Sequence, residues 1–493
     1  MARFVMANRI SGRGSPFETA RSHEAFETLW EREIRPVSSK LGTLEASDVN
    51  RRRVIFFEAD PRDLSIRTAG HSNDVIVEPE ILHRVKKPMY TAQTAGAVEL
   101  SQLDVSVLDE RSRPLNEAKV VLFVRTQQGE IEQLASTTAR SGRCRFQNPS
   151  GQWTALSVVV LPAGGYWSMG VAVQSNTIEV RCPRLEFEKI NWWNLAVGAG
   201  GGRLSAGYGI RLGVLDSGVG PHPCLSHVSD LGSLINGTRR LDGGRDVSGH
   251  GTQVCGVIGS RPFAVRQVIG VAPDVEILSM RVEDSSGTAN QGDIAAGIDL
   301  LAQHYNADLI NLSLVSEQAS EIEYDAIASA HEIGTLCLCA AGNSGGAVAY
   351  PAAFPIAVAI SAVGKQNWAP NGTLASTMTP TGQDKIGTDG FFLANFSCFG
   401  PELSCTSPGV GIVSTVPETR DLYAPFADCS GTSLATPLAA ATLAALLSGN
   451  EAFLSSQRDS VRALRARAIL EENCKSIGLD VTYQGRGLPQ EYR

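Results

Sequence analysis

One serine stands where a polar turn gives way to a long apolar run. The run, residues 438–447, consists almost entirely of Leu and Ala, is too long for a strand and lacks alternation, which predicts a buried helix. Ser433 therefore lies at or near a helix N-terminus, where unpaired backbone N–H groups and the helix dipole favour negative charge. A serine in this place serves either as a helix cap or as a nucleophile whose oxyanion the same amides hold.

Three further residues could complete a nucleophilic site. Asp216 directly follows the apolar stretch 210–215, which predicts a strand that ends in a carboxylate. His250 stands between two glycines, which let other chain segments approach its ring. Asn343 lies in a glycine-rich turn after the predicted strand 336–340, and its amide could donate to an oxyanion. Each of them alone has an ordinary structural explanation, but an acid, a base, an amide and a serine together favour nucleophilic catalysis.

The elements that must position these residues begin at about residue 186. From there to the end, predicted strands such as 309–314 alternate with predicted helices such as 293–303 and 322–333. This alternation predicts an α/β fold with a mostly parallel sheet flanked by helices. Such folds place their sites at the carboxyl ends of the strands, which is where Asp216 is expected.

The four residues also carry a resemblance to a known family. In chain order, the motifs VLDSG, GHGT, AAGN and GTSLATP resemble the four motifs of subtilisin-like serine proteases, the subtilases. Acid, histidine and serine follow one another in the order known for subtilisin. The resemblance covers about residues 186–490 and implies a subtilisin-like fold with serine endopeptidase activity. It implies that Ser433 is the nucleophile and that His250 is its base. Asp216 would orient the histidine, and Asn343 would bind the oxyanion together with the Ser433 N–H.

The same resemblance implies which residues bind the substrate. The residues that would pair with an extended substrate backbone are Ser313, Leu314, Val315, Gly287, Thr288 and Ala289. The residues that would line the first specificity pocket are Ala340, Ala341 and Ala349. Their small side chains predict a preference for an apolar residue before the cleaved bond. Backbone pairing would give affinity with little demand on the rest of the substrate sequence.

The part of the chain before residue 186 predicts two smaller domains. Residues 1–92 have the pattern of a small α/β unit, and the segments DVIVEPE and ILHRVKKP within it resemble a subtilase pro-domain. This resemblance implies an inhibitory contact with the catalytic domain, residues 186–493, whereas an ordinary accessory domain is the alternative. Residues 98–184 show short alternating strands separated by turns, which predicts a small β-sandwich that acts as a spacer or a docking module.

Composition limits the partners and the compartment. The chain of 493 residues has a formal net charge of -8, which argues against a nucleic-acid partner. We expect no membrane association, because no run approaches 18 uninterrupted apolar residues. The first nine residues show no secretory signal, and ten cysteines without the spacing of a small disulfide scaffold indicate reduced thiols. We therefore expect a cytoplasmic protein, with non-classical export as an alternative.

No metal and no cofactor are expected. The cysteines do not form a metal-binding spacing, and Cys224 stands where many subtilisins carry a calcium-ligating Asp. A proteolytic mechanism of the predicted kind needs only protein groups and a protein or peptide substrate.

Two other functions remain open at the level of sequence. The chain could be a dedicated maturase that trims one partner protein or precursor peptide, with the sandwich as its docking site. It could also be a catalytically silent binding protein on the same fold, although the joint presence of all four motif residues argues against that. For an active protease, an ordinary histidine pKa of about 6.5 predicts that activity falls on acidification through roughly pH 6–7.

Overall fold

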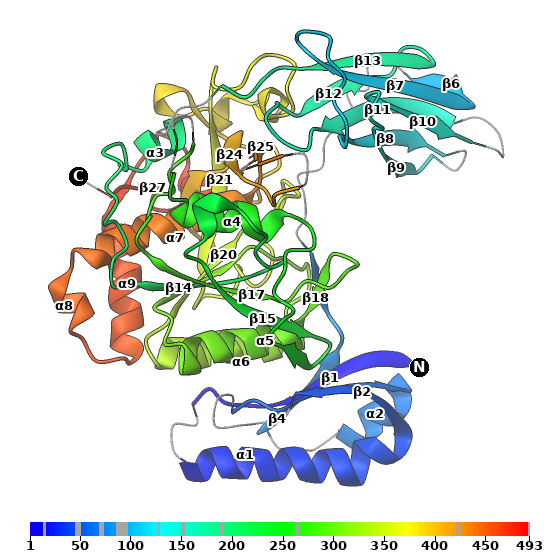
Figure 1. The fold of residues 1–493 in the computed structure, drawn as a ribbon. Coiled ribbons are helices and arrows are strands. Elements are labelled where there is room, and N and C mark those ends of the chain that lie inside the picture. The colour runs from blue at the N-terminus through cyan, green and yellow to red at the C-terminus, as the bar shows by residue number, and fades with distance from the viewer. Residues whose placement is uncertain are drawn as a thin grey trace.

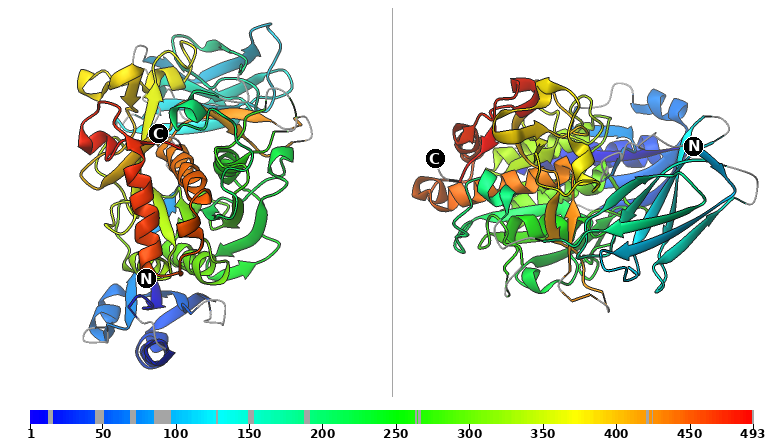
Figure 2. Two further views of the ribbon diagram at one scale, coloured as in Figure 1. Left: turned by 90° about the vertical axis from the view of Figure 1, so that its left-hand side faces the viewer. Right: turned by 90° about the horizontal axis from the view of Figure 1, so that it is seen from above.

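The computed structural model describes residues 1–12, 16–44, 51–68, 73–84, 97–126, 129–148, 153–186, 191–262, 264, 267–419, 422–423 and 425–491. Along the chain these residues form a small four-stranded unit, a β-sandwich and a large α/β unit (Figure 1). The small unit and the sandwich lie at opposite ends of the large one (Figure 2). The expected domain boundary at residue 92 lies outside the described residues.

The large unit is built on a nine-stranded sheet. Its strand order is β16-β15-β17-β14-β19-β20-β21-β22, and β23 also pairs with β21. All neighbours pair in parallel except at β16 and β22, which are antiparallel. The strands are β14 (Arg211–Asp216), β15 (Ser229–Ile235), β16 (Thr238–Arg240), β17 (Glu276–Arg281), β19 (Leu309–Leu312), β20 (Leu336–Ala340), β21 (Val358–Lys365), β22 (Phe391–Leu393) and β23 (Leu403–Pro408). The mostly parallel sheet expected from the sequence is thus confirmed.

Helices cover both faces of this sheet, which explains why its strands are apolar runs rather than alternating ones. On one face the core includes side chains of α4 (His250–Gly259), α7 (Thr432–Ser448) and α9 (Ser460–Glu472). On the other face it includes side chains of α5 (Gln291–Asp299) and α6 (Glu321–Glu332). Successive residues of β14 alternate between the two faces, so that Val214 belongs to the first core and Leu215 to the second.

The small N-terminal unit is an antiparallel sheet of order β2-β3-β1-β4 with two helices. Its elements are β1 (Ala2–Asn8), α1 (Pro16–Leu29), β2 (Ser38–Leu44), β3 (Val54–Ala59), α2 (Pro61–Thr68) and β4 (Val75–Pro79). One face of the sheet packs on α1 through residues such as Phe26 and Phe57. The other face presents Val5 and Phe56 to the core around α5 and α6, so the unit lies directly against these two helices (Figure 1).

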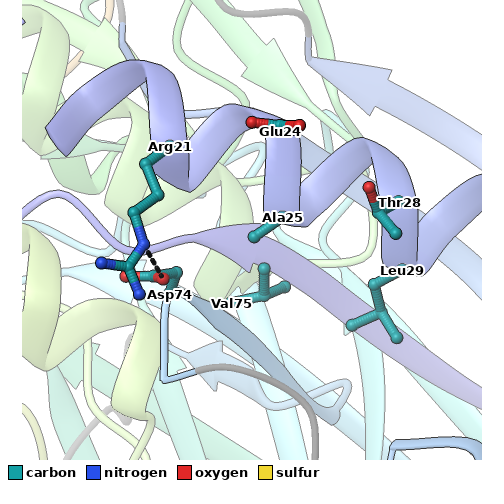
Figure 3. A pocket seen from close by; sticks show the side chains of 7 residues that line it. All are labelled: Arg21, Glu24, Ala25, Thr28, Leu29, Asp74 and Val75. Atoms are coloured by element: carbon teal, nitrogen blue, oxygen red, sulfur yellow. Dashed lines mark ion pairs between the residues drawn. The ribbon is translucent and has the colours of Figure 1, made fainter. Parts of the chain in front are cut away.

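A pocket on this unit lies between α1 and the start of β4. It is lined by Arg21, Glu24, Ala25, Thr28, Leu29, Asp74 and Val75 (Figure 3). Arg21 and Asp74 form an ion pair at 3.4 Å across it. None of the site residues expected from the sequence lines this pocket, and we assign it no role.

The β-sandwich consists of a three-stranded sheet, β10-β7-β13, packed on β12-β11-β8-β9 with β6 added at β11. Its strands are β6 (Val98–Leu100), β7 (Gln102–Asp109), β8 (Lys119–Arg125), β9 (Ile131–Thr137), β10 (Arg143–Gln147), β11 (Trp153–Leu161), β12 (Met169–Ala172) and β13 (Thr177–Cys182). Trp167 packs edge-on against Trp368 of the α/β unit, and the Ser168 hydroxyl donates to Asp428 at 2.8 Å. The sandwich is therefore docked on the α/β unit rather than separated from it.

None of the described helices is both long and apolar enough to cross a membrane.

Candidate active site

The carboxyl ends of three neighbouring parallel strands meet at one edge of the sheet. Asp216 is the last residue of β14, Ser313 directly follows β19, and Asn343 stands three residues beyond β20. Helix α4 begins at this edge with His250, after Gly249, whose φ of +85° suits a residue without a Cβ atom. Local strand ends and a helix start thus bring an acid, a base and an amide to one place.

Asp216 and His250 form a buried pair. Nδ1 of His250 lies 2.8 and 3.0 Å from the two carboxylate oxygens of Asp216, so its N–H donates to the acid. Burial by itself lowers the pKa of His250, but the charge and the hydrogen bond of Asp216 outweigh that effect. The pKa of His250 is therefore raised above its ordinary value of 6.5. With Nδ1 engaged in this way, Nε2 is the ring nitrogen that can exchange a proton with a substrate or a nucleophile.

A hydrogen-bonded loop fixes the position of this pair. Asp246 accepts hydrogen bonds from the Ser217 hydroxyl at 2.7 Å, from the Gly249 N–H at 2.8 Å and from the Thr252 N–H at 2.9 Å. The Ser217 hydroxyl in turn accepts from the Gly251 N–H at 2.8 Å. Sequence reasoning did not single out Asp246, although it lies four residues before His250 and caps the turn that leads into α4.

Ser433 is the second residue of α7, as expected for a serine at a helix N-terminus. Asn343 is oriented toward it, because the Asn343 Oδ1 accepts from both the N–H and the hydroxyl of Thr432, each at 2.9 Å. The Asn343 Nδ2 and the Ser433 Oγ both lie near Gly431. A Cβ atom on this glycine would lie 3.3 Å from the former and 2.9 Å from the latter. The amide donor and the hydroxyl thus border the same space.

The serine and the histidine come from two helices, α4 and α7, that pack against each other. In the described part of the chain no hydrogen bond joins Ser433 Oγ to His250 Nε2, and this nitrogen is buried without a hydrogen-bond partner. Catalytic hydrogen bonds are often long in proteins without bound substrate and tighten in the reacting complex. Ser433 is also tied to the sheet edge, because its carbonyl accepts from the Ser313 hydroxyl at 2.9 Å.

A second carboxylate borders the pair. Glu283, two residues beyond β17, is 2% exposed. Burial and the nearby charge of Asp216 raise the pKa of Glu283 to about 7. Sequence reasoning missed this residue. The available signal was an acid directly after the mostly apolar stretch 277–282, at the same sheet edge as Asp216.

The expected backbone-binding segments face each other across a short strand of the N-terminal unit. Strand β5 (Leu82–Arg84) pairs antiparallel with β18 (Thr288–Asn290), which contains the expected residues Thr288 and Ala289. On its other side, Arg84 exchanges two backbone hydrogen bonds with Val315, at 3.1 and 3.2 Å. Of the remaining expected residues, Leu314 is buried, and Gly287 adjoins β18 in a turn with φ of +80°.

The three alanines expected to line the first specificity pocket lie close together. Ala340 ends β20, and both it and Ala341 are buried. The Ala349 N–H donates to the Ala341 carbonyl at 2.8 Å.

Among the described residues, no group of three or more His, Cys, Asp or Glu side chains could hold a metal ion.

Fold and site together define an α/β protein with a buried Asp–His pair and a serine at a helix N-terminus, close to an amide donor. Comparison with known proteins agrees with this class. Residues 207–486 match the model of the Subtilase family, which is more than half of the chain. The chain belongs to the subtilase family.

Several characterised proteases are similar to this chain. The chain is 34% identical over 242 residues to the minor extracellular protease Epr of Bacillus subtilis, covering 49% of this chain and 32% of the relative. It is 31% identical over 283 residues to an alkaline protease of Alkalihalobacillus alcalophilus, covering 57% of this chain and 63% of that protease. It is also 31% identical over 283 residues to subtilisin Savinase of Lederbergia lenta, covering 57% of this chain and 89% of that relative. The chain thus spans about a third of the first relative and less than two thirds of the second.

These comparisons contradict the cytoplasmic location expected from the sequence, because the relative Epr is named an extracellular protease. The expectation rested on the first residues of the sequence and on the cysteines. All ten cysteines are free thiols in the structure. Buried thiols pack as small apolar groups in many proteins, so unpaired cysteines do not identify a reducing compartment.

Proposed function

We propose that the chain is a serine endopeptidase that hydrolyses peptide bonds with Ser433 as its nucleophile. The observation that carries this proposal is the buried Asp216–His250 pair, which leaves Nε2 as the basic nitrogen of a chain in the subtilase family. Ser433 and Asn343 border one space beside Gly431, which supports the roles of nucleophile and oxyanion donor.

The reaction uses the serine and the histidine in two stages. Ser433 Oγ attacks the carbonyl carbon of the scissile bond while His250 Nε2 takes the hydroxyl proton. The tetrahedral intermediate collapses to an acyl-enzyme, and His250 returns the proton to the leaving amine. Water then attacks the ester by the same route and releases the acid product. Asp216 keeps the proton on Nδ1 and stabilises the imidazolium in both stages.

The oxyanion of each tetrahedral intermediate is held by two donors, the Asn343 amide and the Ser433 backbone N–H. The Asn343 donor is already oriented before the reaction, because Thr432 engages its Oδ1 twice. Preorganised donors of this kind act mainly in the transition state. Removing the side-chain donor lowers kcat by about 10²–10³, a magnitude established for subtilisin itself.

The substrate would bind as an extended strand between β18 and the segment 313–315. Strand β5 of the chain's own N-terminal unit already lies in this position. The small side chains of Ala340, Ala341 and Ala349 favour an apolar residue directly before the cleaved bond.

The same contact supports a role for residues 1–92 as an inhibitor of the catalytic unit. Strand β5 pairs with β18 on one side and with Val315 on the other, so it competes directly with a substrate for both edges. The rest of the unit holds β5 in place. Arg52 is buried and contacts Asp299 of α5 at 2.7 Å and Asp325 of α6 at 2.8 Å.

The experiment is hydrolysis of unfolded casein by the full chain and by Ser433→Ala. We expect hydrolysis by the wild type and a loss of at least about 10³-fold in the variant, because only the nucleophile is removed. A variant that keeps more than a few per cent of the turnover would overturn the assignment of Ser433. Casein that stays intact while one specific partner is trimmed would favour the dedicated maturase. No hydrolysis of any protein, either by the full chain or by an Arg52→Ala variant whose N-terminal contact is weakened, would favour a silent binding protein.

A further inference from the structure

We propose that Glu323 forms an acidic subsite, which selects a cationic side chain in the substrate at a position upstream of the cleaved bond. The inference rests on the proposed endopeptidase function and adds a substrate class to it, namely peptides with a basic residue at that position. The chain's own His83 occupies the subsite in the structure.

The backbone of β5 shows why only one of its side chains can enter the protein. Residues of a strand point alternately to its two sides. In β5, Leu82 and Arg84 are exposed, and His83 between them is 0% exposed. His83 pairs with Ala289 of β18, and the next residue, Arg84, pairs with Val315. A substrate strand that took the same register would place one side chain where His83 lies.

The side chain that His83 meets is a carboxylate. Glu323 belongs to the first turn of α6, and both side chains are fully buried. Nε2 of His83 lies 3.1 Å from Oε1 of Glu323. Within the described residues neither carboxylate oxygen has a hydrogen-bond partner, and the ring nitrogen of His83 is the basic group that lies against this carboxylate. The carboxylate therefore faces strand β5.

This arrangement discriminates between substrates because of the cost of an unpaired buried charge. A basic side chain in place of His83 keeps Glu323 paired. An apolar side chain leaves the carboxylate buried alone, or forces it to bind a proton, and both outcomes are unfavourable. A site built around a polar partner rejects a substrate that lacks it far more strongly than an apolar pocket rejects a side chain of the wrong size.

The test is a competition between peptides that copy residues 78–90 of the chain and carry a quenched fluorophore. One peptide has the natural His at the position of His83, the second has Lys and the third has Leu. All three are incubated in one tube with the full-length chain, and products are quantified by mass. Because the substrates share the tube, the ratios of kcat/KM do not depend on the fraction of active enzyme. We expect the His and Lys peptides to be preferred over the Leu peptide by at least about 10-fold.

Variants of the enzyme locate the source of the preference. Glu323→Leu should prefer the Leu peptide, and Glu323→Gln, which keeps the shape, should lose most of the discrimination. Glu332→Leu removes an exposed acid from the other end of the same helix and should keep the wild-type ratios. Labelling by a fluorophosphonate, carried out in parallel, shows that each variant is folded and active.

Equal cleavage of the three peptides by a wild type that hydrolyses casein would overturn the subsite and leave the proposed function intact. Wild-type ratios that persist in Glu323→Leu would also overturn it, because His83 and Glu323 would then be only a structural pair. Hydrolysis of casein without cleavage of any peptide would contradict the register on which the inference depends. Absence of both hydrolysis and labelling, in the wild type and equally in an Arg52→Ala variant whose N-terminal contact is weakened, would overturn the proposed function itself, and the subsite with it.

Discussion

At the scale of single residues, the site depends on how the carboxylates around His250 tune its protonation. Asp216 holds Nδ1 at 2.8 Å, and Glu283 adds a second acidic group beside the pair. Burial lowers the pKa of His250, whereas Asp216, Glu283 and Asp246 all favour the imidazolium and raise it. The net effect is a raised pKa, so the ordinary value assumed from the sequence is too low.

The pH profile should show this directly. Protonated His250 cannot accept the Ser433 proton, so kcat/KM should fall on acidification. Because the pKa is raised, the midpoint of this fall should lie above pH 6.5, and full activity should need a more alkaline solution than an unperturbed histidine requires. The measurement is the kcat/KM of casein-derived peptide hydrolysis between pH 5 and pH 10. A profile that stays flat down to pH 5 would exclude His250 as the base.

Glu283→Gln should move that midpoint to lower pH. Charged Glu283 raises the pKa of His250, and the amide removes the charge while keeping the shape. Glu276→Gln is the matched control, because this residue begins the strand that Glu283 follows and its side chain is 53% exposed beside Arg211. A midpoint that is unchanged or higher in Glu283→Gln, relative to the control, would refute the electrostatic role of this carboxylate.

At the scale of elements, the relative position of the Ser433 hydroxyl and the Asn343 amide depends on how α7 begins. Gly431 precedes the helix with φ of +153°, a conformation that residues with a side chain rarely adopt. Its missing Cβ leaves the space that Ser433 Oγ and Asn343 Nδ2 border. The helix start therefore shapes the space that we propose as the oxyanion site.

Gly431→Ala should lower kcat by at least about 10-fold, because the new methyl group displaces the hydroxyl or the amide and strains the backbone by roughly 1–3 kcal/mol. Gly449→Ala is the control. This glycine follows the other end of α7 with φ of -92°, and no atom lies within 4 Å of the position that an added Cβ would take. Steady-state kinetics measure the loss of turnover, and thermal melting measures the loss of stability that backbone strain causes. If Gly431→Ala retained the wild-type kcat, the proposed crowding at the helix start would be incorrect.

The sequence predicts these elements well because their signals are local. An apolar run that ends in Asp216, and an Ala-rich run after Ser433, each carry their own pattern. The strand predicted at 336–340 and the helix predicted at 322–333 lie within one residue of β20 and α6. The helix starting at Asp293 in the prediction begins two residues earlier, where the Asn290 side chain caps it by accepting from the Asp293 N–H.

The buried charges, in contrast, could not be predicted from local patterns. The sequence of its helix does not distinguish Glu323 from the other acidic residues there, and its partner His83 is 240 residues away in the chain. Arg52 forms ion pairs with Asp299 and Asp325, which are similarly far from it in the sequence. Such pairs are created by tertiary packing, and a sequence pattern records only that charged residues are present.

At the scale of the whole molecule, the N-terminal unit is held on the large α/β unit by more than apolar packing. Arg52 is fully buried between α5 and α6, and Glu78 accepts from the backbone N–H of Glu321 at 2.9 Å at the start of α6. An acid near a helix N-terminus interacts favourably with the helix dipole. These contacts fix the unit from which β5 extends between β18 and Val315.

Arg52→Ala should weaken this attachment and raise the activity of the full chain on casein. Breaking a buried ion pair by removing one partner costs about 3–5 kcal/mol, because two carboxylates are left buried. We therefore expect faster casein hydrolysis and a lower melting temperature. Arg3→Ala is the control, since this exposed arginine pairs with Glu58 within the same unit. Unchanged activity in a destabilised Arg52→Ala variant would indicate that residues 1–92 are an accessory domain and not an inhibitor.

The measurement that tests the central claim most directly is the site of covalent labelling by a fluorophosphonate, mapped on the full chain by peptide mass analysis. The account predicts a single adduct on Ser433, which is lost in Ser433→Ala and in His250→Ala, because the hydroxyl reacts only when the histidine accepts its proton. An adduct on another residue, or equal labelling of the His250→Ala variant, would contradict the mechanism.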